Sequence, residues 1–304
     1  MRVWRTLDEQ PPRIIAHRGA SGLRPEHTLE GYALAITQGA DLIEPDLVPT
    51  RDGVLIARHE RELSRSTDVS LRVPWPDTAS SSKKAGARWF ADDYDAEQIS
   101  KLRAVQPFPG RSRALDGQFA IPRFSEVLEL AAAQWRVGQK LGVYPEIKHP
   151  SELLAKGIDS TALLIAELRA RALAAAHSPV WVQCFEIAPL RRVHEACGNA
   201  TFALFDWLNA EQLARLHRYS SWLSGVALSK ANVIGAKAEP GLIAQAHDLG
   251  WQVHVWTLRD DSVMNGFADV QDEYQALFNA GADALFCDFP EGGVNARLRW
   301  QQAL

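Results

Sequence analysis

Residues 14–60 read IIAHRGASGLRPEHTLEGYALAITQGADLIEPDLVPTRDGVLIARHE, and short apolar runs in this stretch end in charged and histidine side chains. The first run, residues 14–16, is followed by His17 and Arg18. The second run, residues 42–48, contains two carboxylates. Short apolar runs are typical of strands buried in a parallel sheet, and polar residues at strand ends often carry function. The stretch therefore predicts an α/β protein with a site at its strand ends.

The two carboxylates of the second run are Glu44 and Asp46. Residues two apart on a strand face the same way, so the spacing predicts that these side chains project together. Asp-Gly at residues 52–53 predicts a tight turn, after which residues 54–57 return as a hairpin arm and lead to His59. Two histidines and two paired carboxylates at strand ends predict a functional site rather than a solvated surface.

The rest of the chain alternates apolar strands with helices, which indicates a parallel sheet. Pro45 breaks the strand rule within the second run, as happens at functional sites. About eight units fit the length, so we predict a (β/α)8 TIM barrel. An open doubly wound sheet is the alternative, but no glycine-rich fingerprint follows the first strand. Further strands are expected at residues 141–148, 180–185, 201–205, 225–229, 251–258 and 284–288.

Residues 63–118 interrupt this alternation with stretches rich in proline, serine and other turn residues. Within them, residues 92–105 could form one helix. Because the segment offers few apolar positions for a core of its own, we predict an insertion in one barrel domain spanning residues 1–304. Its place directly after His59 predicts that it packs over the active-site mouth and restricts which substrate fits.

A third carboxylate, Glu146, falls late in the next strand, two residues before Lys148. Buried carboxylates are costly unless they are paired or bind a metal. Three converging carboxylates, Glu44, Asp46 and Glu146, offer the hard oxygen ligands that Ca²⁺ or Mg²⁺ prefers. The alternative is a buried salt-bridge cluster in which Glu44 and Asp46 pair with Arg18 and Lys148.

The composition excludes several protein classes. The 304 residues carry a formal net charge of -4 and so give no basic field for nucleic acid. No apolar run approaches the roughly 18 residues of a transmembrane helix. Three scattered cysteines form neither a disulfide framework nor a metal motif. Because residues 1–13 lack the apolar core of a signal peptide, we expect a cytoplasmic protein, or a periplasmic one if a leader was removed.

The quoted motifs resemble those of the glycerophosphodiester phosphodiesterase family, in the variant typical of the periplasmic branch of bacterial enzymes. The resemblance rests on several spaced motifs, is densest over residues 14–68 and continues weakly to the C-terminus. These motifs are HRGASG at 17–22, PEHT at 25–28, IEPDL at 43–47, TRDG at 50–53, RHE at 58–60 and EIK at 146–148.

The resemblance implies metal-dependent hydrolysis of a glycerophosphodiester to glycerol 3-phosphate and an alcohol. It assigns His17 and His59 as the catalytic acid and base, roles that suit side chains titrating near neutrality. Phe185 and Trp256 fall where the family lines its glycerol pocket, although Phe185 could equally pack in the core. Two alternatives remain: phospholipase D-like cleavage of lipid phosphodiesters, and a non-catalytic barrel that binds a ligand. The implied metal ligands are Glu44, Asp46 and Glu146, and the implied phosphate-binding residues are Arg18 and Lys148.

Overall fold

The computed structural model describes residues 3–72 and 88–302. Its eleven strands form one sheet in the order β4-β3-β6-β7-β8-β9-β10-β11-β1-β2-β5. The strands are β1 (Arg13–His17), β2 (Leu42–Glu44), β3 (Asp46–Pro49), β4 (Leu55–Ala57), β5 (Gly142–Val143), β6 (Glu146–Ile147), β7 (Val182–Cys184), β8 (Thr201–Phe205), β9 (Gly225–Ser229), β10 (Gln252–Leu258) and β11 (Ala284–Cys287).

The strand order has two ends only because two parallel strands of a closed sheet are each interrupted once. β2 and β3 are successive halves of one strand, separated only by Pro45, and β5 and β6 are halves of the next. β2 pairs with β5 while β3 pairs with β6, so the two ends of the strand order meet. Counting each interrupted strand once gives eight parallel strands, with β4 as an antiparallel arm on β3. The predicted (β/α)8 barrel is confirmed.

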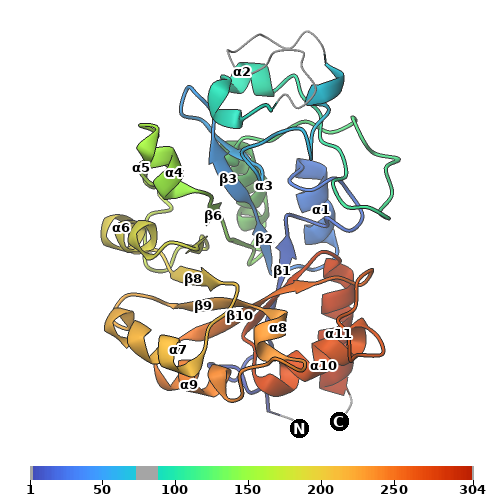
Figure 1. The fold of residues 1–304 in the computed structure, drawn as a ribbon, viewed down its shortest axis with the longest axis vertical. Helices are drawn as coiled ribbons and strands as arrows, with labels where there is room; N and C mark the ends of the chain where they lie inside the picture. The colour runs from blue at the N-terminus through green and yellow to red at the C-terminus, as the bar shows by residue number, and fades with distance from the viewer. Residues whose placement is uncertain (1–2, 73–87, 303–304) are drawn as a thin grey trace.

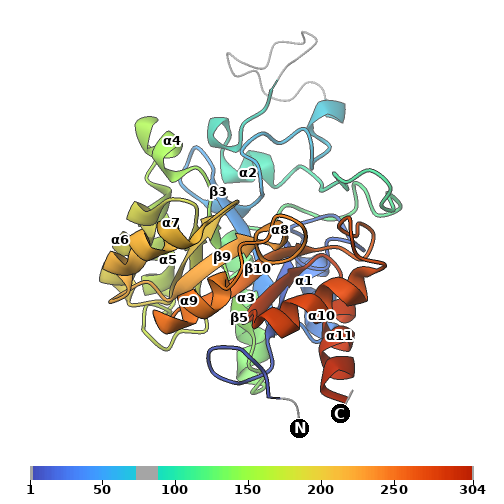
Figure 2. The ribbon, with the colours of Figure 1, turned by 60° about the horizontal axis from the view of Figure 1, so that its bottom comes forward.

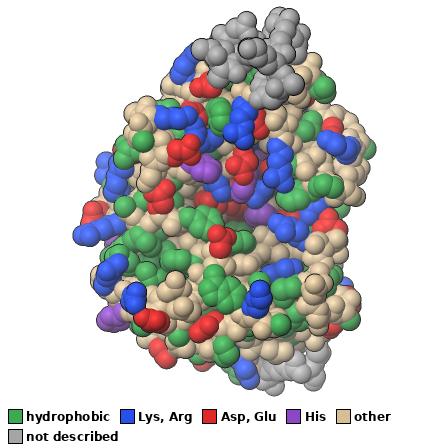
Figure 3. Space-filling view, viewed as in Figure 1, with side chains coloured by type: hydrophobic (Ala, Val, Ile, Leu, Met, Phe, Trp, Pro, Cys, Tyr) green, Lys and Arg blue, Asp and Glu red, His purple; other side chains and the backbone are tan. Residues whose placement is uncertain are grey.

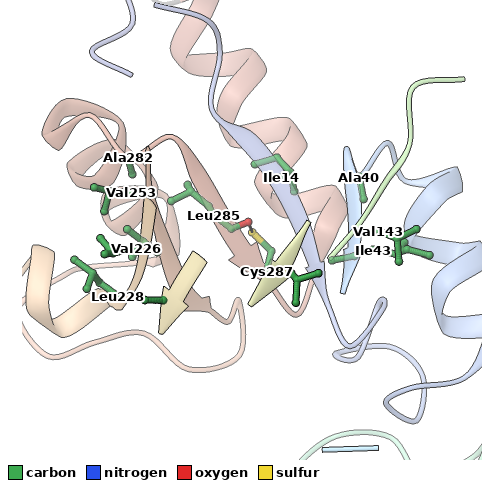
Figure 4. Packing of buried hydrophobic residues seen from close by; sticks show 14 of the residues in the cluster. Ile14, Ala40, Ile43, Val143, Val226, Leu228, Val253, Ala282, Leu285 and Cys287 are labelled. Carbon is green, nitrogen blue, oxygen red and sulfur yellow. Dashed lines mark hydrogen bonds between the residues drawn. The ribbon is translucent and has the colours of Figure 1, made fainter. Parts of the chain in front are cut away.

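Side chains alternate between the inside of the barrel and the layer under the helices. Ile14 and Ile43 belong to the outer core with Val253 and Leu285, which Figure 4 shows between strands and helices. Ile15, by contrast, lies in the inner cluster with the aromatic side chains that fill the barrel. This period of two fixes which polar residues face inward where the strands end.

Helices surround the strands, as Figure 1 shows. Thr28 begins α1 by accepting a hydrogen bond from the Gly31 backbone N–H at 3.1 Å. The helices are α1 (Leu29–Thr37), α2 (Ala96–Ile99), α3 (Phe124–Arg136), α4 (Pro150–Ala155), α5 (Ser160–Ala170), α6 (Ile187–Cys197), α7 (Ala210–Leu216), α8 (Lys230–Val233), α9 (Leu242–Asp248), α10 (Val270–Ala280) and α11 (Pro290–Gln302), with short 3₁₀ helices η1 (Val69–Leu71), η2 (Ala91–Asp93) and η3 (His217–Tyr219). Within the described residues, every helix falls short of the length and apolarity that crossing a bilayer requires.

The described part of the expected insertion, residues 63–72 and 88–118, lies around α2 at the end of the molecule opposite the two termini (Figures 1 and 2). Residues 73–87 of the insertion are outside the described residues. The helix expected over residues 92–105 is wrong: the chain there makes only η2 and α2. Beyond α2, the backbone groups of Arg103 and Ala104 bond to Asp68 and Phe119 instead of continuing a helix. The segment also buries more apolar surface than expected, in a cluster completed by the hairpin residues Val48 and Ile56.

Candidate active site

A cavity of about 460 Å³ opens where the barrel strands end. Figure 3 shows a hollow near the middle of this face, where acidic, basic and histidine side chains meet beside hydrophobic ones. Eight of the nine residues singled out in the sequence line this cavity: His17, Arg18, Glu44, His59, Glu146, Lys148, Phe185 and Trp256. The ninth, Asp46, is buried immediately beside Glu44 and Glu146. The structure thus brings all nine residues to one place.

The three carboxylates converge as their spacing predicted. Asp46 is paired with Glu146 in the sheet register, and oxygen atoms of Glu44, Asp46 and Glu146 all lie within 4.8 Å of one another. Burial and the neighbouring charges of Asp46 and Glu146 raise the pKa of Glu44 well above its usual range. Burial also raises the pKa of Glu146 to about 8, despite the opposing charge of Lys148. Ionising all three carboxylates together is therefore costly, and a bound cation would relieve that cost.

Salt bridges reach this cluster without satisfying it. Arg18 Nε lies 3.3 Å from an Asp46 oxygen, but its Nη1 donates to Glu26 at 2.8 Å. Lys148 Nζ lies 2.9 Å from Glu146 and 4.0 Å from Asp46 Oδ1. Asp46 Oδ1 is buried and accepts no hydrogen bond from any described residue. The salt-bridge interpretation is thus correct in part, while an unused carboxylate oxygen and the all-oxygen donor set fit a hard divalent cation.

His17 forms a buried pair that the sequence did not reveal. Its Nδ1 lies 2.6 Å from Oδ1 of Asp288, just after β11, and Asp288 is fully buried. Burial alone would raise the pKa of Asp288, but His17, Arg111 and Arg259 hold it well below its usual range. An ionised Asp288 makes Nδ1 the protonated nitrogen of a neutral His17 and leaves Nε2 as the proton acceptor. Burial and then the charge of Arg18 lower the pKa of His17, which keeps it neutral near pH 7.

The second histidine, His59, has different surroundings. Its side chain is 29% exposed, and its Nδ1 lies 2.7 Å from a carboxylate oxygen of Glu60. The third histidine of the opening stretch, His27, is fully buried between Tyr32 and Asp46, with Nε2 2.9 Å from Asp46. Burial lowers its pKa to about 4, so His27 supports Asp46 as a neutral side chain.

Backbone geometry places Arg18 where its N–H and side chain both reach carboxylates. Arg18 adopts a φ of 60°, and its backbone N–H donates to Glu44 at 2.9 Å. Gly19 follows with a φ of 85°, and a Cβ there would lie 2.9 Å from the Gly31 backbone. Glycine is therefore required for the HRG turn to pack against α1.

Aromatic side chains form the opposite wall of the cavity. Phe185 is 45% exposed and makes an edge-to-face contact with Trp256, with ring centroids 6.3 Å apart. This exposure excludes ordinary core packing for Phe185. Cys184, beside it, is buried and bonded to backbone groups, and burial raises its pKa to about 12, so it is a structural thiol.

Other polar residues of the site were not singled out in the sequence. Gln183 donates from Nε2 to Glu44 Oε1 at 3.0 Å and lies in the middle of its strand, where no charge marks it. Asp288 had a weak signal, since it ends the strand predicted over residues 284–288 as the only charged residue of ALFCD. Asp206, Lys230 and Arg259 also line the cavity.

Comparison with known proteins identifies the family and the fold. The model of the "Glycerophosphoryl diester phosphodiesterase family" matches residues 17–292. A Haemophilus influenzae protein named glycerophosphodiester phosphodiesterase is 28% identical over 92% of this chain and 88% of its own length. A putative glycerophosphoryl diester phosphodiesterase from Silicibacter pomeroyi shares the fold with a TM-score of 0.74 and 22% identity, over 98% of both chains.

An Oleispira antarctica phosphodiesterase, solved in complex with the product sn-glycerol-3-phosphate, shares the fold with a TM-score of 0.68. It is 20% identical and covers 96% of this chain and 98% of its own. These structural likenesses bear on the fold alone. The family match, by contrast, runs from His17 to residue 292 and so spans nearly the whole barrel. The chain belongs to the glycerophosphoryl diester phosphodiesterase family.

Proposed function

We propose that this protein is a phosphoric diester hydrolase that converts glycerophosphodiesters to glycerol 3-phosphate and an alcohol. Family membership supports the reaction class. The observation that carries the proposal is the convergence of a buried carboxylate triad and two histidines on one cavity. Phosphodiester cleavage needs positive charge at the phosphoryl oxygens and proton transfer at the attacking and departing oxygens.

The triad of Glu44, Asp46 and Glu146 would hold one divalent cation, Ca²⁺ or Mg²⁺. When bound, the cation supplies positive charge to the phosphoryl oxygens. Arg18 and Lys148 add to that charge from the cavity wall, Arg18 through its planar fork and Lys148 as a point charge. The aromatic wall of Phe185 and Trp256 offers an apolar surface to the glycerol carbons.

His17 is the better placed of the two histidines to accept a proton. Its Nδ1 is held by Asp288, so Nε2 remains to take the proton of the nucleophile, either water or the glycerol 2-hydroxyl of the substrate. A new bond then forms from that oxygen to phosphorus, and the bond to the alcohol oxygen breaks. With water as nucleophile this step gives glycerol 3-phosphate directly. With the 2-hydroxyl it gives a cyclic glycerol phosphate, and a water must then attack phosphorus and break the bond to the 2-oxygen, which takes up a proton. His59 donates a proton to the departing alcohol from the partly exposed side of the cavity.

An assay of glycerol 3-phosphate release tests the proposal directly. The protein is freed of metal with EDTA and supplied with Mg²⁺ or Ca²⁺, using glycerophosphocholine and glycerophosphoethanolamine as substrates. We expect release with metal and little without it, and loss of activity in Glu146→Gln. Glu97→Gln alters an exposed carboxylate of α2 and serves as the matched control. No release from either diester with either metal would contradict the proposal and favour a binding module.

A further inference from the structure

The insertion contributes a loop, residues 105–116, that contacts the segments following β1 and β11 at the end of the barrel where the cavity opens. Two backbone hydrogen bonds of 2.9 Å, Ala104 N–H to Phe119 and Gly117 N–H to Ala104, close the base of this loop. Within it, QPFPG at residues 106–110 has two prolines that restrict the backbone. Gln106 Nε2 donates to the backbone carbonyl of Ser21 at 3.1 Å. The loop is thus fixed both at its base and against the segment that follows β1.

Arg111 in this loop reaches a buried position. Its side chain is only 3% exposed. The guanidinium forms a fork on Asp261, with Nε at 2.7 Å and Nη2 at 3.2 Å from the two carboxylate oxygens. The same Nη2 donates to Asp288 Oδ2 at 2.5 Å. Arg111 therefore holds the carboxylate oxygen of Asp288 that His17 does not use.

A second path from Arg111 leads to His17. Arg111 Nη1 donates to the Ser21 carbonyl at 3.3 Å, and Ser21 Oγ donates to the His17 carbonyl at 2.8 Å. The contacts form a ring from Arg111 through Asp288 to the imidazole of His17, and back through its backbone and Ser21. This closed set of contacts restrains both the plane of the His17 imidazole and the His17 backbone.

Arg259 does not duplicate this role. It also contacts Asp288 Oδ2, at 3.0 Å, but its side chain is 34% exposed. Phe108 of the loop lies against both guanidinium groups, 4.4 Å from Arg111 and 5.5 Å from Arg259. Arg111 is therefore the more buried partner, and its loop also carries the aromatic ring that orders the other arginine.

We propose that Arg111 is a positioning residue for the proposed diester hydrolysis, through which the 105–116 loop holds Asp288 and His17 in catalytic geometry. This inference rests on the proposed function of His17 as proton acceptor. Among described residues 63–72 and 88–118, none lines the cavity, so the loop acts on the histidine rather than on substrate. Loss of the guanidinium leaves Asp288 Oδ2 to the partly exposed Arg259, so the carboxylate and the imidazole bonded to it are held less firmly.

Four variants test this role. Arg111→Ala removes the guanidinium, and Arg111→Lys keeps the charge but not the fork. Asp261→Asn weakens the anchor of Arg111 without touching Asp288. Arg113→Ala is the matched control, because Arg113 is exposed in the same loop and pairs only with Asp116 among described residues. Melting temperatures report folding, and steady-state kinetics give kcat and KM separately.

We expect kcat of Arg111→Ala to fall about 10- to 100-fold with KM nearly unchanged, the usual cost of a misplaced catalytic group. The kcat of Arg111→Lys and of Asp261→Asn should fall less, and the kcat of Arg113→Ala should match that of wild type. An unchanged kcat overturns the inference, as does a rise in KM alone or an equal loss in Arg113→Ala. If Arg111→Ala does not fold, the kcat values of Arg111→Lys and Asp261→Asn test the inference instead, and an unchanged kcat in both overturns it.

A spectroscopic readout separates this inference from the proposed function. In wild type, the proton on His17 Nδ1 should give a low-field NMR signal that His17→Asn removes. We expect Arg111→Ala to shift or broaden this signal and Arg113→Ala to preserve it. If wild type hydrolyses no diester, the proposed function fails while this signal still tests the coupling. An unperturbed signal in folded Arg111→Ala overturns the coupling.

Discussion

The imidazole of His17 is held on one side, whereas that of His59 is partly open to solvent. Because both line the same cavity from different strand ends, a phosphate there would lie between them. We expect His17→Ala and His59→Ala each to lower turnover by about 10²–10⁴, the usual range for a positioned acid or base. Turnover is measured under saturating substrate, with circular dichroism as the folding control. A folded variant that keeps more than about a tenth of wild-type turnover excludes that histidine from proton transfer.

Glu26 gives the site a pH-dependent stability. Burial raises its pKa, but Arg18 outweighs burial and lowers the pKa from 4.5 to about 2. Because the folded-state pKa is depressed, the unfolded state binds more protons between these values. The stabilisation is therefore complete above about pH 4.5 and is lost as the pH falls toward 2.

We expect Glu26→Gln to be less stable than wild type at pH 7 by on the order of 3 kcal/mol. The difference should shrink by pH 3, where Glu26 is protonated in the unfolded chain. Urea unfolding at the two pH values measures it, with the exposed Glu97→Gln as control. A difference that stays constant with pH would show that Glu26 contributes packing rather than charge.

For single residues, the sequence predicted contacts only between side chains that share a strand or a short motif. Glu44 and Asp46 are two residues apart, so their convergence followed from strand geometry alone. Asp288 lies 271 residues from His17, and Arg111 lies 177 from Asp288. No local pattern reports such pairs, because only closure of the barrel brings them together.

Among the helices and strands, the two interrupted strands supply the carboxylates of the site. Pro45 separates β2 from β3, and the residues that flank it are the metal ligands we propose, Glu44 and Asp46. Pro145 precedes Glu146 at the matching break between β5 and β6. The expected break at Pro45 is confirmed, and the function of the residues beside it stays a proposal. The helix expected over residues 92–105 was wrong because packing against the hairpin, which a sequence window does not report, overrides helical propensity there.

The insertion is joined to the barrel by its own apolar contacts. Leu63 is fully buried in a cluster that includes Val48 of β3 and Ile56 of β4. We expect Leu63→Ala to lower the free energy of unfolding by about 2–5 kcal/mol, as deletion of a buried leucine side chain does. Leu71→Ala, at a position 83% exposed in the same segment, is the control and should change little.

Urea unfolding followed by fluorescence and by circular dichroism measures both variants. One cooperative transition shared by the two probes would support a single domain over residues 1–304. If Leu63→Ala leaves the barrel transition unchanged and loses only an early one, the insertion folds separately from the barrel.

For the whole molecule, eight repeated strands were enough to predict the barrel, since alternation and length leave few other architectures. What alternation does not predict is the content of the interior. His254 lies at its centre, with Nδ1 2.9 Å from the Tyr144 hydroxyl and its ring against Phe202. Burial lowers its pKa to about 3, so it fills the barrel as a neutral side chain. His254 supports the floor of the site and has no contact with the triad in the described residues.

The carboxylate triad makes the stability of the whole barrel depend on a cation. Without one, burial and the neighbouring carboxylates oppose ionisation of Glu44 and Glu146 and raise the pKa of both. A cation that binds only the folded state adds about 2.7 kcal/mol when present at 100 times its dissociation constant, which corresponds to a rise in Tm of about 5 °C. We therefore expect Ca²⁺ or Mg²⁺ to raise the Tm of EDTA-treated protein.

Glu44→Gln distinguishes a bound cation from general screening of charge. Burial and the neighbouring carboxylates already disfavour an ionised Glu44 without metal, so the variant changes little charge there, and its amide oxygen can still accept from Gln183. Its Tm without metal should therefore stay close to that of wild type, and added metal should no longer raise it, because one of the three carboxylate ligands is gone. Screening would act on any carboxylate, so Glu97→Gln should respond to metal as wild type does. An equal rise in Tm for wild type and Glu44→Gln would place the cation elsewhere and remove the triad as its site.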